Sequence, residues 1–168
     1  MPFIRPIREF RTIRELLGGA ERLARQAGAE QPGAEHLLLA AVALSDGTAR
    51  RAFEGVGADP DRLPEAIEAQ HAEALRAVGI AAGGAALPAT PAPPTAAIYR
   101  SGPSAQAVFR RAVDLSATPA PRRLLGAHVV LAVAEREQGT AARALRHLRI
   151  DREALAAAAR EVLAEAGA

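Results

Sequence analysis

The most constraining feature of this sequence is a segment that occurs twice. Residues 36–66 align without a gap to residues 128–158, at an offset of 92 positions. Such internal similarity predicts two copies of one structural unit, and units this small gain stability by packing against each other. Eleven of the 31 aligned positions are identical: His36/His128, Leu39/Leu131, Ala40/Ala132, Gly47/Gly139, Thr48/Thr140, Ala49/Ala141, Arg51/Arg143, Ala52/Ala144, Asp59/Asp151, Leu63/Leu155 and Ala66/Ala158.

The composition predicts an all-α fold. Alanine supplies much of the 49% hydrophobic content and aromatic residues make up only 3%, which favours helices with small-residue contacts over sheets. The expected architecture is two tandem four-helix repeats related by a pseudo-twofold axis, with eight helices in all. Apolar periodicity and capping residues place these helices at about 12–27, 34–45, 48–55, 59–78, 103–117, 127–138, 140–148 and 151–166.

The chain divides into four segments. We expect a lead-in over 1–11, a first repeat over 12–78, a Gly/Pro/Ala-rich linker over 79–102 and a second repeat over 103–168, with both repeats in one compact domain. Residues 77–99 carry no charge, but four prolines and three glycines disfavour a membrane-spanning helix. Because the first residues also lack the apolar core of a signal peptide, we expect a cytoplasmic protein without membrane contact.

Missing residue types exclude several kinds of site. Without cysteine there is no disulfide, thiol nucleophile or cysteine zinc site. All 21 basic residues are arginine, so there is no P-loop lysine and no Schiff base. No catalytic constellation stands out, and we therefore expect no enzyme activity and no cofactor.

The remaining polar residues have structural interpretations. His36 and His128 lack partners at a metal-ligand spacing, which indicates buried, hydrogen-bonded histidines. The unmatched His71 is expected on the surface, as is His147. Helix caps are predicted at Thr48, Thr140, Asp59 and Asp151.

Two motifs of the first repeat resemble the Clp N-terminal repeat. Residues 33–39, Gly-Ala-Glu-His-Leu-Leu-Leu, are similar to its Gly-Thr-Glu-His-Ile-Leu-Leu core, and residues 46–52 are similar to the helix start that follows it. The family carries this repeat in tandem, as the substrate- and adaptor-docking N-terminal domain of ClpA/ClpC-type chaperone ATPases. The resemblance covers roughly residues 10–165. It implies a free-standing recognition module without the ATPase rings, which acts as an adaptor, regulator or decoy for Clp proteolysis.

The resemblance also implies binding residues. Family members bind phosphoarginine at helix starts, where free N–H groups suit the phosphate and a carboxylate holds the guanidinium. The matching positions are Ala34 and Glu35 in the first repeat, and Gly126 and Ala127 in the second. The second repeat lacks the carboxylate, which predicts poor phosphoarginine binding. Glu35 has an alternative role, stabilisation of its own helix through the helix dipole.

Three aromatic residues complete the predicted site. Phe3, Phe10 and Tyr99 lie near positions where the family has aromatics in a hydrophobic groove for peptides and cyclic-peptide antibiotics; ordinary packing is the alternative. The expected partners are a Clp ATPase, its clients or adaptors, and cyclic-peptide natural products. The competing hypothesis is an arginine-rich, nucleic-acid-binding regulator, which the net charge of only +2 disfavours.

Overall fold

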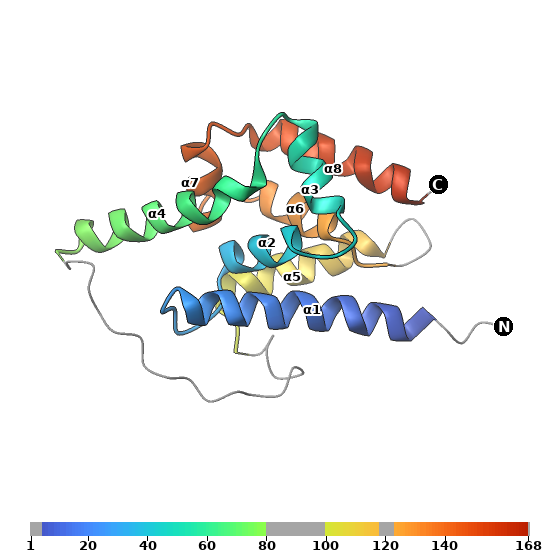
Figure 1. The fold of residues 1–168 in the computed structure, drawn as a ribbon, viewed down its shortest axis with the longest axis horizontal. Helices are drawn as coiled ribbons and strands as arrows, with labels where there is room; N and C mark the ends of the chain where they lie inside the picture. Colours follow the sequence, from blue (N-terminus) through green and yellow to red (C-terminus); the bar gives the residue numbers. More distant parts are fainter. Residues whose placement is uncertain (1–4, 80–99, 118–122, 168) are drawn as a thin grey trace.

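The structure, a computed structural model, describes residues 5–79, 100–117 and 123–167 (Figure 1). These residues contain helices and no strand, which confirms the predicted all-α, two-repeat architecture. The bounds of α2 and α6, and those of α3 and α7, differ by the same 92 residues that separate the sequence repeats. The elements are α1 (Arg5–Gln26), α2 (Ala34–Val42), α3 (Thr48–Gly55), a short 3-10 helix η1 (Pro60–Arg62), α4 (Leu63–Ala77), α5 (Pro103–Ser116), α6 (Gly126–Ala134), α7 (Thr140–His147) and α8 (Arg152–Gly167).

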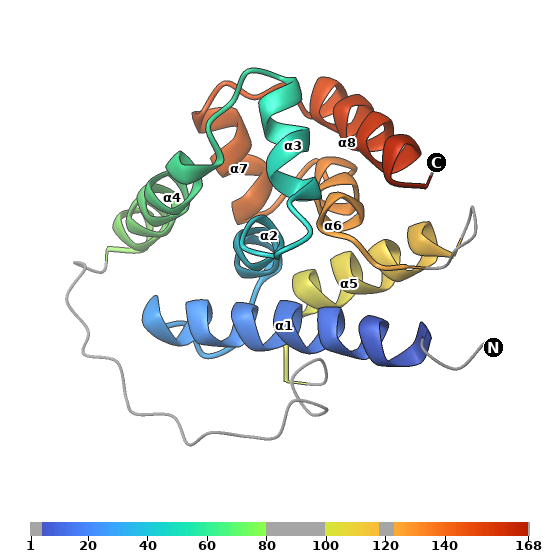
Figure 2. The ribbon, with the colours of Figure 1, turned by 45° about the vertical axis from the view of Figure 1, so that its right-hand side comes forward.

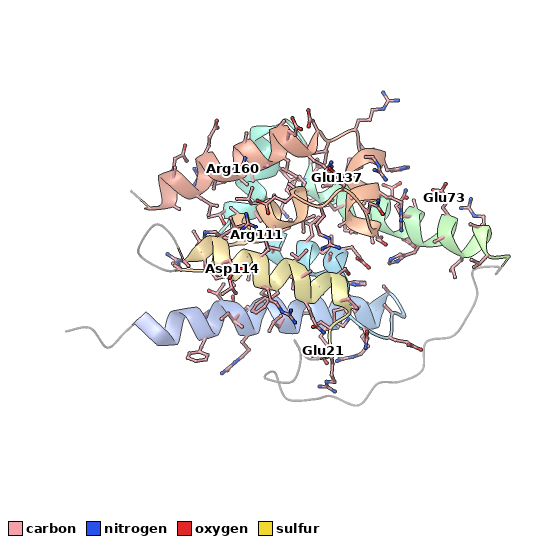
Figure 3. All side chains as sticks on the ribbon, turned by 180° about the vertical axis from the view of Figure 1, so that it is seen from behind. Glu21, Glu73, Arg111, Asp114, Glu137 and Arg160 are labelled. Atoms are coloured by element: carbon pink, nitrogen blue, oxygen red, sulfur yellow. The ribbon has the colours of Figure 1, made fainter. Side chains whose placement is uncertain are left out.

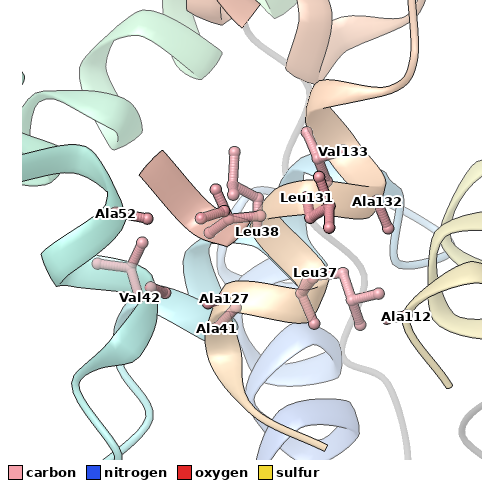
Figure 4. Packing of buried hydrophobic residues seen from close by; sticks show 14 of the residues in the cluster. Leu37, Leu38, Ala41, Val42, Ala52, Ala112, Ala127, Leu131, Ala132 and Val133 are labelled. Atoms are coloured by element: carbon pink, nitrogen blue, oxygen red, sulfur yellow. The ribbon is translucent and has the colours of Figure 1, made fainter. Parts of the chain in front are cut away.

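The helices α2 and α6 form the centre of the molecule. All nine residues of α6 are buried, as are all those of α2 except Leu39. A helix that is apolar on every side must be covered on every side. Helices α1 and α5 cover the central pair on one side, and α3, α4, α7 and α8 cover it on the other (Figure 2). Small residues such as Ala41 and Ala127 let α2 and α6 approach closely within this core (Figure 4).

The outer helices of the first repeat pack against helices of the second repeat. In the first repeat, α3 packs against α8 and α6 of the second repeat, and α4 packs mainly against α7 of the second repeat. The packing is uneven, because α8 also packs broadly on its own central helix α6 whereas α4 barely touches α2. Neither repeat therefore has a complete core of its own.

Four predicted helix bounds were wrong. Helix α4 begins at Leu63 rather than at residue 59, because Pro60–Arg62 form a separate 3-10 turn. Helix α1 begins at Arg5 rather than Thr12, since Pro6 fits the first turn of a helix, and it continues through Gly18 and Gly19. A Cβ at Gly19 would lie 3.1 Å from the Cβ of Ala40, so this glycine lets α1 approach α2 closely.

The central helices end earlier than predicted. Helix α2 ends at Val42 rather than Ser45, and α6 ends at Ala134 rather than Gln138. In the second repeat the physical reason is visible. The guanidinium of Arg152 donates to the carbonyl oxygens of Ala134 (3.0 Å) and Arg136 (2.9 Å), which satisfies acceptors that a longer helix would have used.

Helices α3 and α7 end in the same way. After α3, the N–H of Ala58 donates to the Phe53 carbonyl and Gly57 has a φ of 67°; after α7, Ile150 donates to Leu145 and Arg149 has a φ of 58°. These are Schellman caps, which need a left-handed residue that glycine adopts most readily. The two repeats thus share this cap geometry, although the second repeat has Arg149 where the first has Gly57.

No helix among the described residues is long and apolar enough to cross a membrane. Most of the predicted linker, including the uncharged segment over 80–99, lies outside the described residues.

Candidate functional site

The start of α2 is a compact polar cluster. Gly33 is the N-cap, and its N–H donates to Nδ1 of His36 at 3.0 Å, while the N–H of His36 donates back to the Gly33 carbonyl at 3.1 Å. The N–H of Ala34 donates to Oγ of Ser104, on α5 of the second repeat, at 3.1 Å. The first free N–H groups of this helix are therefore already paired within the protein.

Glu35 folds back over the same helix start. Its carboxylate lies so near Gly33 that a Cβ on this glycine would be 2.5 Å from Oε1. The Oε1 atom is also 3.6 Å from Nδ1 of His36 and 3.5 Å from Nε2 of His71, which α4 supplies. Burial disfavours the charged carboxylate, but hydrogen bonds from His71 and its own backbone N–H, together with the two histidine charges, hold the pKa of Glu35 below its usual value.

His36 has the structural role that the sequence predicted. The side chain is 2% exposed, and its Nδ1 accepts a backbone hydrogen bond, so the neutral ring carries its proton on Nε2. Burial lowers the pKa of His36, against the opposing effect of Glu35. His128 is the counterpart in α6, where its Nδ1 accepts from the N–H of Leu125 at 3.0 Å and burial likewise lowers its pKa.

Side chains of the first repeat accept hydrogen bonds from the N–H groups at the start of α6. The N–H of Gly126 donates to Oδ2 of Asp46 at 3.0 Å, and the N–H of Ala127 donates to Oγ1 of Thr48 at 2.9 Å. Asp46 Oδ1 in turn accepts from the N–H and the hydroxyl of Thr48, at 2.8 and 2.6 Å. One carboxylate thus joins the starts of α3 and α6 across the boundary between the repeats.

Close packing explains the glycine at this position. A Cβ on Gly126 would lie 2.9 Å from the Ala41 carbonyl oxygen and 2.9 Å from the Cβ of Ala49. A threonine, as the family motif has here, would require α2 and α3 to move away. The helix start of the second repeat is therefore built for contact with the first repeat.

The structure places the predicted residues in three groups. Ala34 and Glu35 lie together at the α2 start, and Gly126 and Ala127 lie together at the α6 start. Phe10 is 67% exposed on α1, whereas Phe3 and Tyr99 lie outside the described residues. The hydrophobic groove expected from these three aromatic residues therefore stays a prediction.

Sequence reasoning missed contacts between helices that are distant in the sequence. His71 was expected on the surface but is half-buried and approaches Glu35. Thr48 was expected to cap α3, but it is the first residue of that helix and caps α6 instead. The carboxylates of Asp59 and Asp151 do accept from the N–H groups of Asp61 and Glu153, at 2.9 and 2.8 Å, as predicted.

Many arginines are paired with acids. Arg50 binds Asp61 at 2.7 Å and Arg111 binds Glu135 at 2.6 Å (labelled Arg111 in Figure 3), and further ion pairs join Arg11 to Glu15, Arg25 and Arg100 to Glu21, and Arg51 to Glu165. Such exposed pairs contribute little to stability, but they neutralise part of the basic charge, and the net charge of the chain is only +2. The high arginine content is accordingly weak evidence for a nucleic-acid surface.

Comparison with known proteins identifies the family. The model of the Clp repeat (R) N-terminal domain matches residues 11–148, which include the first copy of the repeat and most of the second. The chain belongs to this family. In fold, it is similar to the crystal structure of the N-terminal domain of the caseinolytic protease associated chaperone ClpD from Arabidopsis thaliana, with a TM-score of 0.62 and 20% sequence identity. The match covers 97% of this chain and 99% of the ClpD domain, and no curated protein matches.

The cap between the repeats generates a stability prediction. Thr48→Val removes the Oγ1 acceptor and leaves the buried N–H of Ala127 unpaired, which should lower the free energy of unfolding by about 1–3 kcal/mol. Thr140→Val is the matched control from the other repeat, because Thr140 Oγ1 accepts only a 3.3 Å bond from the exposed Arg143. Urea unfolding would measure both. Equal losses in the two variants would contradict the proposed role of Thr48.

The buried histidines generate a pH prediction. Their pKa values lie below the ordinary 6.5 in the folded protein, so between the two values the unfolded chain binds protons that the native protein excludes. The stability that depends on keeping the two histidines neutral is therefore fully present above pH 6.5 and is lost as the pH falls below it. His36→Gln/His128→Gln keeps an acceptor at the helix start without a titrating group, and should flatten this loss in urea unfolding between about pH 7.5 and 5.5. The exposed His147→Gln is the control, and an unchanged profile in the double variant would refute the prediction.

Proposed function

We propose that this chain is a non-enzymatic peptide- and protein-binding module that docks a Clp ATPase or its clients and adaptors. The observation that carries the proposal is membership of the Clp N-terminal domain family, whose model matches residues 11–148. The similarity in fold to a domain of a protease-associated chaperone supports it. In this role the chain acts as an adaptor, or as a decoy that competes for the same clients.

The polar cluster at α2 supports a role without catalysis. His36 is buried and Glu35 is turned back onto its own helix, so both groups stabilise the helix start rather than face a substrate. Among the described residues, no group of three or more His, Cys, Asp or Glu side chains could hold a metal ion.

We further infer that recognition by this module does not depend on phosphoarginine. At α2, Ser104 and His36 occupy the helix N–H groups, and Glu35 already approaches two histidines. At α6, Asp46 places a carboxylate where a phosphate would bind. A ligand would have to displace these internal partners. Cyclic-peptide binding stays a prediction, because Phe10 is the single member of the aromatic set among the described side chains.

A pull-down tests the proposed function. The immobilised protein, incubated with nuclease-treated lysate of its source organism, should enrich a Clp ATPase, a Clp adaptor or known Clp clients. The control bait is an unrelated helical protein of equal net charge, which removes proteins captured by charge alone. Free phosphoarginine added to the lysate should leave the enriched set unchanged, because both helix starts are internally capped.

Enrichment of none of these protein classes would overturn the proposed function. Release of the captured proteins by phosphoarginine would instead show that the helix starts open to ligand, against our inference about them.

A further inference from the structure

A groove of about 530 Å³ lies between the second half of α4 and helix α7. Its lining combines small apolar residues, one glutamine amide and several charged side chains, Glu73 among them on the protruding part of α4 (Figure 3). The lining residues are Gln70, Glu73, Ala74, Ala77, Arg143, Arg146 and His147. None of them belongs to the two helix starts described above.

The internal symmetry shows what is unusual about this groove. The interface of α3 with α8 is the counterpart of the interface of α7 with α4, since each pair differs by 92 residues. Across α3 and α8, Arg51 forms an ion pair with Glu165. The equivalent residues Arg143 and Glu73 line the groove, and no ion pair joins them in the part of the chain that the structure describes.

The two guanidiniums in the groove are weakly satisfied. Arg143 donates to Thr140 Oγ1 at 3.3 Å, and Arg146 donates to the Glu137 carbonyl oxygen at 3.4 Å. Both acceptors are neutral and both bonds are long, whereas a guanidinium offers five donors and binds carboxylates best. These side chains are exposed and remain free to bind an external carboxylate.

The amide of a mostly buried glutamine forms part of the same lining. Gln70 is 8% exposed, and among the described residues no group forms a hydrogen bond with its side chain. The equivalent residue of α8 is Val162, which is buried to the same degree and has no polar atom to satisfy. The Gln70 amide is not among the buried polar atoms that lack a partner, so it remains accessible in the groove and can bond to a ligand that offers hydrogen-bonding groups, such as a peptide backbone.

We propose that the α4/α7 groove binds an acidic peptide segment of a partner protein, with Arg143 and Arg146 pairing with its carboxylates and Gln70 bonding to its backbone. Ala74 and Ala77 leave room for the small apolar side chains of such a segment. Two arginines against one glutamate give the groove a net positive charge, which selects acidic over basic peptides. This inference rests on the proposed function and gives it a site and a class of ligand.

Fluorescence anisotropy tests the proposal on the full chain. The probe is a short fluorescein-labelled peptide of alternating Glu and Ala, with a second peptide in which every Glu is replaced by Gln. The native protein should bind the Glu peptide in a salt-sensitive manner and bind the Gln peptide at least about tenfold more weakly. Arg143→Ala/Arg146→Ala should weaken binding of the Glu peptide by about tenfold or more.

Two matched variants make the test specific. Arg51→Ala, at the equivalent position of the other repeat, should leave the affinity within about twofold of native. Glu73→Gln removes a repulsive carboxylate and should tighten binding by about threefold, which a merely structural role of the groove would not produce. Circular dichroism would confirm that these exposed substitutions leave the fold intact.

Three results would overturn the groove proposal: absence of binding by the Glu peptide, equal binding by native protein and the double-arginine variant, and displacement of the peptide by a single-stranded DNA oligonucleotide that binds more tightly. Failure of the proposed function has a different signature. If native protein and double-arginine variant capture the same Clp components from lysate, the docking function stands and only the groove assignment fails. If native protein captures none, the docking function fails whatever the peptide titration shows.

Discussion

The fold depends on the burial of two central helices, α2 and α6, on nearly every side. A lone four-helix repeat could cover one or two faces of α2 or α6, but not the whole surface of either helix. Each central helix therefore uses its twin and the outer helices of both repeats as cover. Since hydrophobic burial is the main favourable term in folding, this shared cover makes the duplicated chain a single cooperative unit.

Duplication has given the two halves unequal surfaces. On one side, α8 lies against α3 and α6 and the Arg51–Glu165 ion pair spans part of that interface. On the other side, α4 packs on α7 and only lightly on its own central helix α2, and the groove with Arg143 and Glu73 remains open. The helix starts also differ in the acceptor that pairs with their N–H groups, which is the hydroxyl of Ser104 at α2 and the carboxylate of Asp46 at α6. Ligand binding is thus expected where the symmetry is broken rather than at the repeated motifs themselves.

Features with local causes could be predicted from the sequence. The caps at Asp59 and Asp151 follow from neighbouring residues, and the 92-residue offset fixed the correspondence between repeats. The contacts that decide the site join distant parts of the chain: Asp46 meets Gly126 across 80 positions, and Ala34 meets Ser104 across 70. No periodicity or motif encodes which acceptor will reach a helix start from another repeat. The sequence could therefore indicate the candidate residues, but not that their N–H groups are already paired within the protein.

The central claim is that neither repeat folds without the other. It is tested most directly by producing residues 1–79 and 100–168 as separate polypeptides and following helix content and urea unfolding by circular dichroism, alone and mixed. The account predicts little helix and no cooperative transition for either piece alone, and recovery of both in an equimolar mixture. A cooperative unfolding transition in an isolated piece, with the helix content that the intact protein assigns to it, would contradict the claim.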